Sequence, residues 1–335
     1  IFMRILAFET SCDETSVAVV ENGNNVLSNI ISTQIDIHKE YGGVVPEIAS
    51  RHHIENILPV YEEALEKANC KIEDIDYIAV TNKPGLIGSL LVGLMFAKSL
   101  SYSKKIPLLP VNHIDGHLFS TFIDHEIKLP AVSLIVSGGH TNIYYIDEMS
   151  QVKLLGETLD DAVGEAYDKV ARVLGLRYPG GPEIDKLAST GQNDLKIPKA
   201  NISGYNFSFS GIKTYVTNYI NNETMKGNSI NKENIAKSFQ ESIVETLAQK
   251  IRKVIENNDV NTIMVAGGVS ANKRLREKFQ EEFSSDSIEV VFPKYEYCTD
   301  NAAMIGCAAY HFLEKNIETR NEISLDATST KNIKK

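Results

Sequence analysis

The sequence predicts an α/β fold in which one structural unit occurs twice. Three observations lead to this prediction. Each half of the 335-residue chain opens with three runs of strand length, which are followed by helical segments that alternate with further strands. The strands are apolar enough to be buried, and several of them end in polar or glycine-rich turns. These turns occupy matching positions in the two halves, and a duplicated unit of this kind places a cleft between its halves.

The first half is expected to contain three strands, two long helices that alternate with two more strands, and a short helix. Apolar residues recur at helical spacing in the first long helix, as at Ile54, Leu58 and Tyr61. A Pro-Gly turn precedes the second long helix. The expected bounds are 4–8, 15–20 and 26–32 for the opening strands, 46–68 for a helix, 77–81 for a strand, 86–102 for a helix, 107–111 for a strand, and a helix from His113.

The second half repeats this order around one long insertion. The insertion, roughly 175–232, is rich in Gly, Pro, Asn and Ser, and we expect it to cap the cleft. The expected bounds are 131–136, 142–146 and 152–155 for strands, 162–174 and 234–256 for helices, 262–266 for a strand, 271–283 for a helix, 288–292 for a strand and 301–313 for the last helix.

The duplication predicts two lobes. We expect an N-terminal lobe over 3–125 and a C-terminal lobe over 126–315, which includes the insertion. Residues 316–335 form a polar tail.

Composition and charge limit the possible classes of protein. The formal net charge of −10 argues against a general coating of nucleic acid, which needs a basic surface, while 43% hydrophobic residues support a sizeable core. The four cysteines show no disulfide or CxxC pattern, as is usual in a reducing compartment. We find no pattern of a secretion signal, and the most apolar segment, 86–97, is too short to span a bilayer. We therefore expect a cytoplasmic protein that does not enter a membrane.

Two histidines are the most informative candidates for a functional site. His113 and His117 are four residues apart, so they lie on one face of a helical turn and can bind one metal ion together. Such a pair is more often a surface or capping feature, but this pair follows an expected buried strand, where open α/β sheets bind ligands. Asp300 stands at the matching point of the second half. We expect it to complete a metal site across the cleft, from the opposite lobe.

Two glycine-rich turns are suited to bind a phosphate or a nucleotide. Residues 137–141 lie between two apolar strands, and residues 267–272 connect a buried strand to a helix. Backbone N–H groups of such turns can approach an anion closely, and a helix dipole adds to the attraction. Each turn alone is commonly only a structural turn, but two at mirrored positions favour an anion site. The sequence contains no Walker A loop and no dinucleotide-binding fingerprint.

Two aspartates between these turns have two possible roles each. Asp185 follows a tight Pro-Gly-Gly-Pro turn and can accept hydrogen bonds from ribose hydroxyls or cap a helix. Asp168 lies on an expected helix, where it can bind substrate or pair with Lys169 or Arg172. The residues themselves leave both alternatives open.

Five motifs in a fixed order give the chain a specific resemblance. They are Glu9–Ser16 (ETSCDETS), His113–His117 (HIDGH), Val136–Thr141 (VSGGHT), Phe207–Thr214 (FSFSGIKT) and Gly267–Asn272 (GGVSAN). Together they resemble the TsaD family, formerly called Gcp, in its bacterial form, over nearly the whole chain.

The resemblance implies an actin-like, sugar-kinase-like (ASKHA) fold of two duplicated lobes. It also implies a transferase that moves a threonylcarbamoyl group from threonylcarbamoyl-AMP to the exocyclic amine of the adenosine beside the anticodon, in tRNAs that read codons beginning with A. Family members hold one metal ion, iron(II) or zinc, for which His113, His117 and Asp300 would be the ligands here. An adenine nucleotide would bind in the cleft. The implied substrate contacts are Val136, Ser137, Gly138, Gly139, His140, Asp168, Gly181, Asp185 and Asn272.

The resemblance further implies that the protein works in a complex. The expected partners are tRNA, a TsaB-like paralogue that docks on helices of the first lobe, and a TsaE-like ATPase near that interface. We add one hypothesis of our own, that Asp13 and Glu14 orient the attacking amine or transfer its proton.

Three other functions fit parts of the sequence. A metalloprotease would need Glu directly after the first histidine or directly before the second, but Ile114 and Gly116 stand there. A sugar or acetate kinase of the same fold class does not need two histidines and a distant aspartate. A non-catalytic scaffold does not need intact candidate metal ligands, so metal analysis would separate it from an enzyme.

Overall fold

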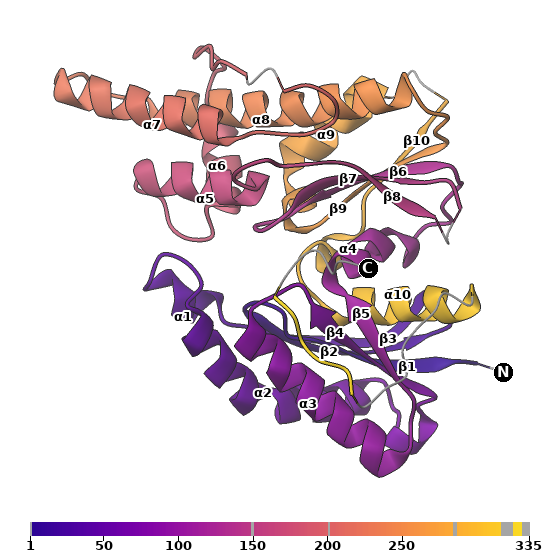
Figure 1. Ribbon diagram of the computed structural model, residues 1–335. Coiled ribbons are helices and arrows are strands. Elements are labelled where there is room, and N and C mark those ends of the chain that lie inside the picture. Colours follow the sequence, from indigo (N-terminus) through magenta and orange to yellow (C-terminus); the bar gives the residue numbers. More distant parts are fainter. Residues whose placement is uncertain (1, 149–150, 200–201, 284–286, 316–323, 330–335) are drawn as a thin grey trace. The chain divides into compact units, whose positions relative to one another are not determined.

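The computed structural model describes residues 2–148, 151–199, 202–283, 287–315 and 324–329. The chain forms two compact units, which are described one at a time. Unit 1 comprises Ile1–Glu126 together with Pro293–Lys335, and unit 2 comprises Ile127–Phe292. Each unit contains a five-stranded sheet, and the ribbon in Figure 1 shows helices packed on both.

The two sheets have the same topology. In unit 1 the order is β3-β2-β1-β4-β5, and in unit 2 it is β8-β7-β6-β9-β10. In each sheet the first three strands of the unit pair antiparallel, and the last two join in parallel. The strands are β1 (Arg4–Glu9), β2 (Glu14–Glu21), β3 (Asn25–Thr33), β4 (Tyr77–Lys83) and β5 (Leu108–Asn112) in unit 1, and β6 (Ala131–Val136), β7 (Thr141–Ile146), β8 (Val152–Glu157), β9 (Thr262–Ala266) and β10 (Glu289–Val291) in unit 2. The predicted α/β duplication is therefore confirmed.

Helices cover both faces of the sheet of unit 1 (Figure 1). Alternate residues of a strand point to opposite faces, so Leu6 and Phe8 pack in the core with α2 and α3, whereas Ala7 and Val20 contact α10. The helices of this unit are α1 (Ile35–Lys39), α2 (Pro46–Lys67), α3 (Ile87–Lys104), α4 (His113–Phe119) and α10 (Ala302–Glu314), with 3-10 turns η1 (Ile72–Asp74), η2 (Ser120–Phe122) and η4 (Tyr295–Tyr297).

Helix α10 differs from the expected division into lobes. The sequence pattern assigns 126–315 to one lobe, but the chain from Pro293 onward belongs to unit 1. The physical reason is the fully buried apolar run Ala302–Ala309, which covers β1 and β2. Gly306 allows this close approach, because a Cβ there would lie 2.7 Å from Val20 Cγ2.

Unit 2 is built around one large apolar core. Val132 and Leu134 of β6 pack there together with Tyr167, Phe239 and Phe279 from the helices. The helices are α5 (Val163–Val173), α6 (Gly180–Ala188), α7 (Ser210–Met225), α8 (Lys232–Ile255) and α9 (Lys273–Phe283), with a 3-10 turn η3 (Gly268–Ala271). The insertion at 175–232 thus contains α6 and α7. Their buried residues Ile184, Ile212, Val216 and Ile220 belong to this core.

A short part of the C-terminal tail packs against unit 1. Leu325 and Ala327 lie on the core beneath α2 and α3, and the N–H of Thr328 donates to the carbonyl of Asn82 at 3.0 Å. The remaining tail, 316–323 and 330–335, lies outside the described residues. None of the helices in the described part of the chain is both long and apolar enough to cross a membrane.

The packing of α10 yields a stability prediction. Gly306→Ala should destabilise the protein by about 1–3 kcal/mol, because the new methyl group would overlap the stiff side chain of Val20. Gly211→Ala in α7 is the matched control, since nothing lies within 4 Å of its Cβ position. Ala is the better helix former, so this control should be neutral or gain up to about 1 kcal/mol. Calorimetric unfolding measures both, and equal stabilities would contradict the packing described.

Candidate functional site

The two histidines lie on α4, which begins directly at the end of β5. The side chain of Asn112 caps this helix by accepting a hydrogen bond from the N–H of Ile114 at 2.8 Å. The spacing of four residues places both imidazoles on one face, with ring centroids 4.6 Å apart. His113 is 6% exposed and His117 is fully buried. The site is therefore an internal one rather than a pair of surface histidines.

Asp300 reaches the histidines because α10 packs closely on α4. A Cβ at Gly116 would lie 2.6 Å from Ile305 Cδ1 of α10, so the glycine lets the two helices pack closely at this contact. Asp300 directly precedes Asn301, whose side chain caps α10. The expectation that the carboxylate comes from the opposite lobe is wrong, since all three candidate ligands belong to unit 1.

The distances fit a shared metal ion. Asp300 Oδ1 lies 3.1 Å from His117 Nε2 and 3.5 Å from His113 Nε2. Ligand atoms at about 2.1 Å from one ion and at tetrahedral or octahedral angles stand about 3.0–3.4 Å apart. The three groups form a cluster in which all candidate ligand atoms lie within 4.8 Å of one another. Two imidazoles and one carboxylate suit both zinc and iron(II).

Glu9 lies behind His113 and was not among the predicted site residues. Its carboxylate is fully buried at the end of β1, and its Oε2 lies 3.0 Å from His113 Nδ1. Burial alone would lower the pKa of His113, but the carboxylates of Asp300 and Glu9 raise it to about 9. A positive charge is thus favoured at this position. The sequence feature that could have indicated Glu9 as a site residue is its position as the acidic end of an otherwise largely apolar strand.

The turn between β1 and β2 adds further carboxylates to unit 1. Asp13 is 7% exposed, and burial together with the charges of Asp13 and Asp300 holds the pKa of Glu14 well above its usual range. Burial also raises the pKa of the Cys12 thiol, which excludes a ready thiolate nucleophile.

A buried histidine ties this turn to α2. His53 Nε2 lies 2.9 Å from the carbonyl oxygen of Cys12, and its Nδ1 lies 2.7 Å from Thr15 Oγ1. Burial lowers the pKa of His53, so the ring is neutral and can make one bond as donor and the other as acceptor. The position of the turn therefore depends on α2.

The glycine-rich turns of unit 2 meet at the ends of adjacent parallel strands. The N–H of Gly164, in the first turn of α5, donates to the carbonyl of Ser137 at 3.2 Å. Gly267 has a φ of 91°, and a Cβ there would lie 2.5 Å from the carbonyl oxygen of Val136. Gly138 has nothing within 4 Å of its Cβ position. The two turns thus form one glycine-lined region at the carboxyl ends of β6 and β9, where open α/β sheets bind ligands.

The candidate aspartates of unit 2 cap helices. Asp168 Oδ1 accepts from the N–H of Gly180 at 2.7 Å, at the start of α6. Asp185 Oδ2 accepts from the N–H of Lys273 at 3.2 Å, at the start of α9. Asp185 therefore caps α9 rather than its own helix. These bonds fix both side chains and leave their role toward a ligand to be tested.

Gln240 connects two of the candidate substrate residues and was also not predicted. It is 2% exposed, and its Nε2 donates to Asp185 Oδ1 at 3.0 Å. Its Oε1 accepts from Asn272 Nδ2 at 3.2 Å, while Asn272 Oδ1 accepts from the N–H of Leu275. A buried amide on a helix has no local sequence signal, so only the fold reveals this network of Gln240.

His140 lies in the first glycine turn, where its N–H donates to Ser137 Oγ at 3.2 Å.

The fourth sequence motif is held by two neighbouring aspartates. Asp160 accepts from the hydroxyls of Ser208 and Ser210 at 2.5 and 2.6 Å, and from the N–H of Phe209. Asp161 pairs with Lys213 at 2.5 Å. The serines and the lysine of this motif thus anchor the start of α7 to the segment before α5.

Comparison with known proteins agrees with the sequence motifs. The family model for TsaD, tRNA N6-adenosine threonylcarbamoyltransferase, matches residues 25–307. A relative of this description from Fusobacterium nucleatum is 57% identical over 313 residues, which are 93% of this chain and 92% of the relative. Another from Clostridium perfringens is 54% identical over 328 residues and covers 96% of each chain.

Solved structures show the same fold at low sequence identity. Full-length HypF has a TM-score of 0.63 at 15% identity, covering 94% of this chain and 47% of HypF. Component A of (R)-2-hydroxyglutaryl-CoA dehydratase from Acidaminococcus fermentans has a TM-score of 0.53 at 14% identity, covering 95% of this chain and all of that protein. Both have the fold of this chain, and with the two matching sheets they confirm the predicted duplicated fold class. The chain therefore belongs to the TsaD family and is a tRNA threonylcarbamoyltransferase.

Proposed function

We propose that this transferase moves the threonylcarbamoyl group from threonylcarbamoyl-AMP to the exocyclic amine of the adenosine beside the anticodon, in tRNAs that read codons beginning with A, and that it requires one divalent metal ion. The observation that carries the metal part is the convergence of His113, His117 and Asp300 within 4.8 Å. Glu9, Asp13, Glu14 and Asp300 place four carboxylates in the same unit, which favours a cation there. Either iron(II) or zinc fits this donor set.

The donor that we propose is already activated, so the site has little covalent work to do. The amine nitrogen forms a bond to the carbamoyl carbon, the bond from that carbon to the phosphate oxygen breaks, and AMP leaves. The amine loses one proton in the same process. A bound metal ion would supply Lewis-acid polarisation of substrate oxygens. The protein must otherwise orient the two substrates and accept the proton.

The glycine turns of unit 2 would bind the adenylate part of the donor. Gly138, Gly139 and Gly268 leave open space where other residues carry a side chain, so their N–H groups can approach a phosphate. Asp185 and Asn272 stand at the start of α9, where the helix dipole favours an anion. The full set of proposed substrate contacts is Val136, Ser137, Gly138, Gly139, His140, Asp168, Gly181, Asp185 and Asn272.

Asp13 and Glu14 are the proposed proton acceptors or orienting groups for the amine. A carboxylate whose pKa is raised by burial and by neighbouring negative charge, as that of Glu14 is, accepts a proton more readily than an exposed one. The raised pKa of Glu14 supports this role in addition to its position in the sequence motif.

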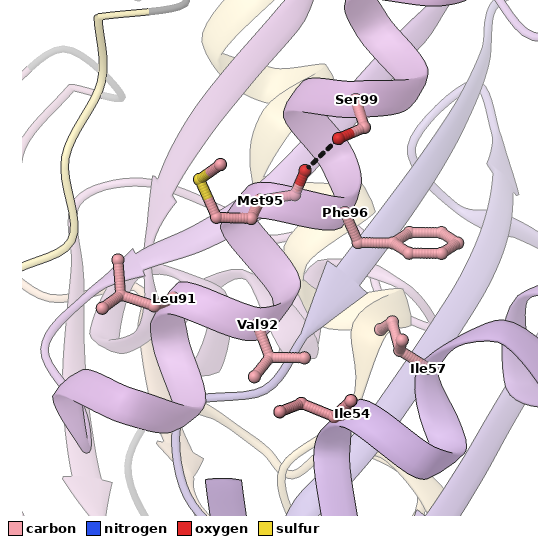
Figure 2. A pocket seen from close by; sticks show the side chains of 7 residues that line it. All are labelled: Ile54, Ile57, Leu91, Val92, Met95, Phe96 and Ser99. Carbon is pink, nitrogen blue, oxygen red and sulfur yellow. Dashed lines mark hydrogen bonds between the residues drawn. The ribbon is translucent and has the colours of Figure 1, made fainter. Parts of the chain in front are cut away.

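A TsaB-like paralogue is the proposed protein partner, docked on α2 and α3. An apolar pocket of about 440 Å³ lies between these helices, lined by Ile54, Ile57, Leu91, Val92, Met95, Phe96 and Ser99. Figure 2 shows the side chains that line it. Ile54 is 65% exposed and Met95 is 55% exposed, and exposed apolar side chains that cluster in this way favour a protein-binding surface. A paralogue with the same fold would present an equivalent helix pair, and two such pairs can pack as four helices. We propose that a TsaE-like ATPase binds near this contact.

The metal proposal predicts the behaviour of His117→Ala. Its metal content should fall from about one ion per chain to below a tenth. Its rate of transfer from threonylcarbamoyl-AMP to unmodified tRNA should fall by more than about a hundredfold. Loss of a ligand should cost more than loss of an outer partner of a ligand, which lowers metal affinity or activity about 10–100-fold. His117 suits the test because its Nδ1 makes no hydrogen bond to the described residues. The control is His52→Ala, at a half-buried histidine that pairs with Glu55, and it should change neither the metal content nor the transfer rate. Full metal content in His117→Ala would refute the site.

The proton-transfer proposal predicts a different pattern for Glu14→Gln. The transfer rate should fall about 10²–10⁴-fold while the metal content stays at one ion per chain, because the substitution removes a proton acceptor and no ligand. Glu40→Gln, at an exposed glutamate of unit 1, serves as the control. An unchanged rate in Glu14→Gln would exclude this role.

The docking proposal predicts the effect of Met95→Asp. Binding to the purified TsaB-like paralogue should weaken at least tenfold, because a charge would be buried in an apolar contact. Met225→Asp is the same substitution at an 85% exposed methionine at the end of α7, and it should leave binding unchanged. Isothermal titration measures both. Equal binding by both variants would place the partner elsewhere, and loss of self-association instead would identify a second copy of this chain as the occupant.

A further inference from the structure

The imidazole of His113 is held between two carboxylates. Glu9 Oε2 lies 3.0 Å from Nδ1, and Asp300 Oδ1 lies 3.5 Å from Nε2. The two ring nitrogens point in opposite directions, so Glu9 lies on the side away from the proposed metal position. Glu9 cannot itself be a ligand on that side, and its role must be exerted through the histidine.

Both carboxylate oxygens of Glu9 are fixed by the surrounding backbone and side chains. Thr81 Oγ1 donates to Oε2 at 2.5 Å, and the N–H of Ser11 donates to Oε1 at 2.6 Å. Thr81 is available because β1 and β4 are parallel neighbours whose carboxyl ends meet. The hydroxyl of Ser11 also lies 3.1 Å from His113 Nδ1. The carboxylate therefore has one orientation, and it is aimed at that nitrogen.

Stability does not explain this arrangement. Glu9 is fully buried, and none of the hydrogen bonds or ion pairs found for it within the described residues involves a lysine or an arginine. Desolvation of a carboxylate costs several kcal/mol, and an apolar side chain of similar volume is often at least as stabilising. A carboxylate retained at such a position points to a function.

The function follows from the two tautomers of imidazole. When Glu9 accepts a hydrogen bond from the Nδ1–H of neutral His113, the lone pair of the ring lies on Nε2 and faces Asp300, as a metal ligand requires. His117 has no such partner, because its buried Nδ1 makes no hydrogen bond to the described residues. The two histidines are therefore not equivalent, because in the described part of the chain only His113 has a carboxylate partner on the side of the ring away from Asp300.

We propose that Glu9 is a positioning residue that fixes the tautomer and orientation of His113 and thereby sets the metal affinity of the site. This inference rests on the metal site proposed above and extends it to a residue outside the set of ligands. It assigns Glu9 to metal binding and not to contact with either substrate.

Metal affinity measured with Co²⁺ tests the inference without an activity assay. The full-length protein is titrated in competition with a chelator, and the absorption spectrum of bound Co²⁺ reports occupancy. Glu9→Gln should raise the dissociation constant about 10–100-fold, as loss of an outer carboxylate partner does at other histidine–metal sites. Glu9→Asp keeps the charge but withdraws it by one methylene, so it should fold readily and raise the constant by a smaller factor.

Two controls separate positioning from a general structural effect. Glu21→Gln changes a glutamate at the end of the neighbouring strand, where it pairs with Arg4, and should leave Co²⁺ affinity within about twofold of the unaltered protein. In a His113→Ala background Glu9→Gln should have no further effect, because its action passes through that ring. Two-bond ¹H–¹⁵N correlation on Zn²⁺-loaded protein should show the His113 proton on Nδ1 and its loss or displacement in Glu9→Gln.

The outcomes are distinguishable. Unchanged Co²⁺ affinity in Glu9→Gln and Glu9→Asp, or an equal loss with and without His113, would overturn the role of Glu9 and leave the metal site standing. Failure of the unaltered protein to bind Co²⁺, Zn²⁺ or Fe²⁺ would overturn the proposed metal site and this inference together.

Discussion

The packing of α10 on the sheet of unit 1 is the contact on which the candidate metal site depends. Glycine at 306 lets the helix approach β1 and β2, and glycine at 116 lets it approach α4. These two contacts fix the start of α10, and Asp300 lies just before it. A methyl group at Gly306 would overlap Val20, and one at Gly116 would overlap Ile305, so either would disturb the packing that positions the carboxylate. Apolar packing therefore determines the geometry of a polar site.

Electrostatics gives the site its preference for a cation. Glu9, Asp13, Glu14 and Asp300 lie in one unit. Burial together with the charges of Asp13 and Asp300 raises the pKa of Glu14, and the charges of Asp300 and Glu9 raise that of His113 to about 9. Such an arrangement is unfavourable unless a positive charge is present, which a proton on His113 or a metal ion can supply. Unit 2 differs, because its glycine turns leave open space beside their N–H groups, as the anion site proposed there requires.

Three of the substrate-binding residues proposed in unit 2 also cap helices. Asp168, Asp185 and Asn272 each accept a hydrogen bond from the first turn of a helix, and the buried amide of Gln240 joins the last two. Their orientations are therefore set before any ligand arrives, which reduces the entropy lost on binding. The same bonds explain why the sequence left capping and substrate contact as equal alternatives for Asp185.

The sequence by itself determined the duplicated order of strands and helices, because short apolar runs and helical periodicity are local properties of the chain. It also singled out His113 and His117, whose spacing places them on one helical face wherever that helix lies. Only the tertiary structure decided that α10 returns to the first sheet, since its uniformly apolar sequence does not specify which sheet it covers. That return put Asp300 in the same unit as the histidines. The tertiary structure also revealed the roles of Glu9 and Gln240, whose partners His113, Asp185 and Asn272 are more than thirty residues away along the chain. Long-range partners of buried polar groups leave no periodic signal, so they become visible only when the strands and helices are placed in space.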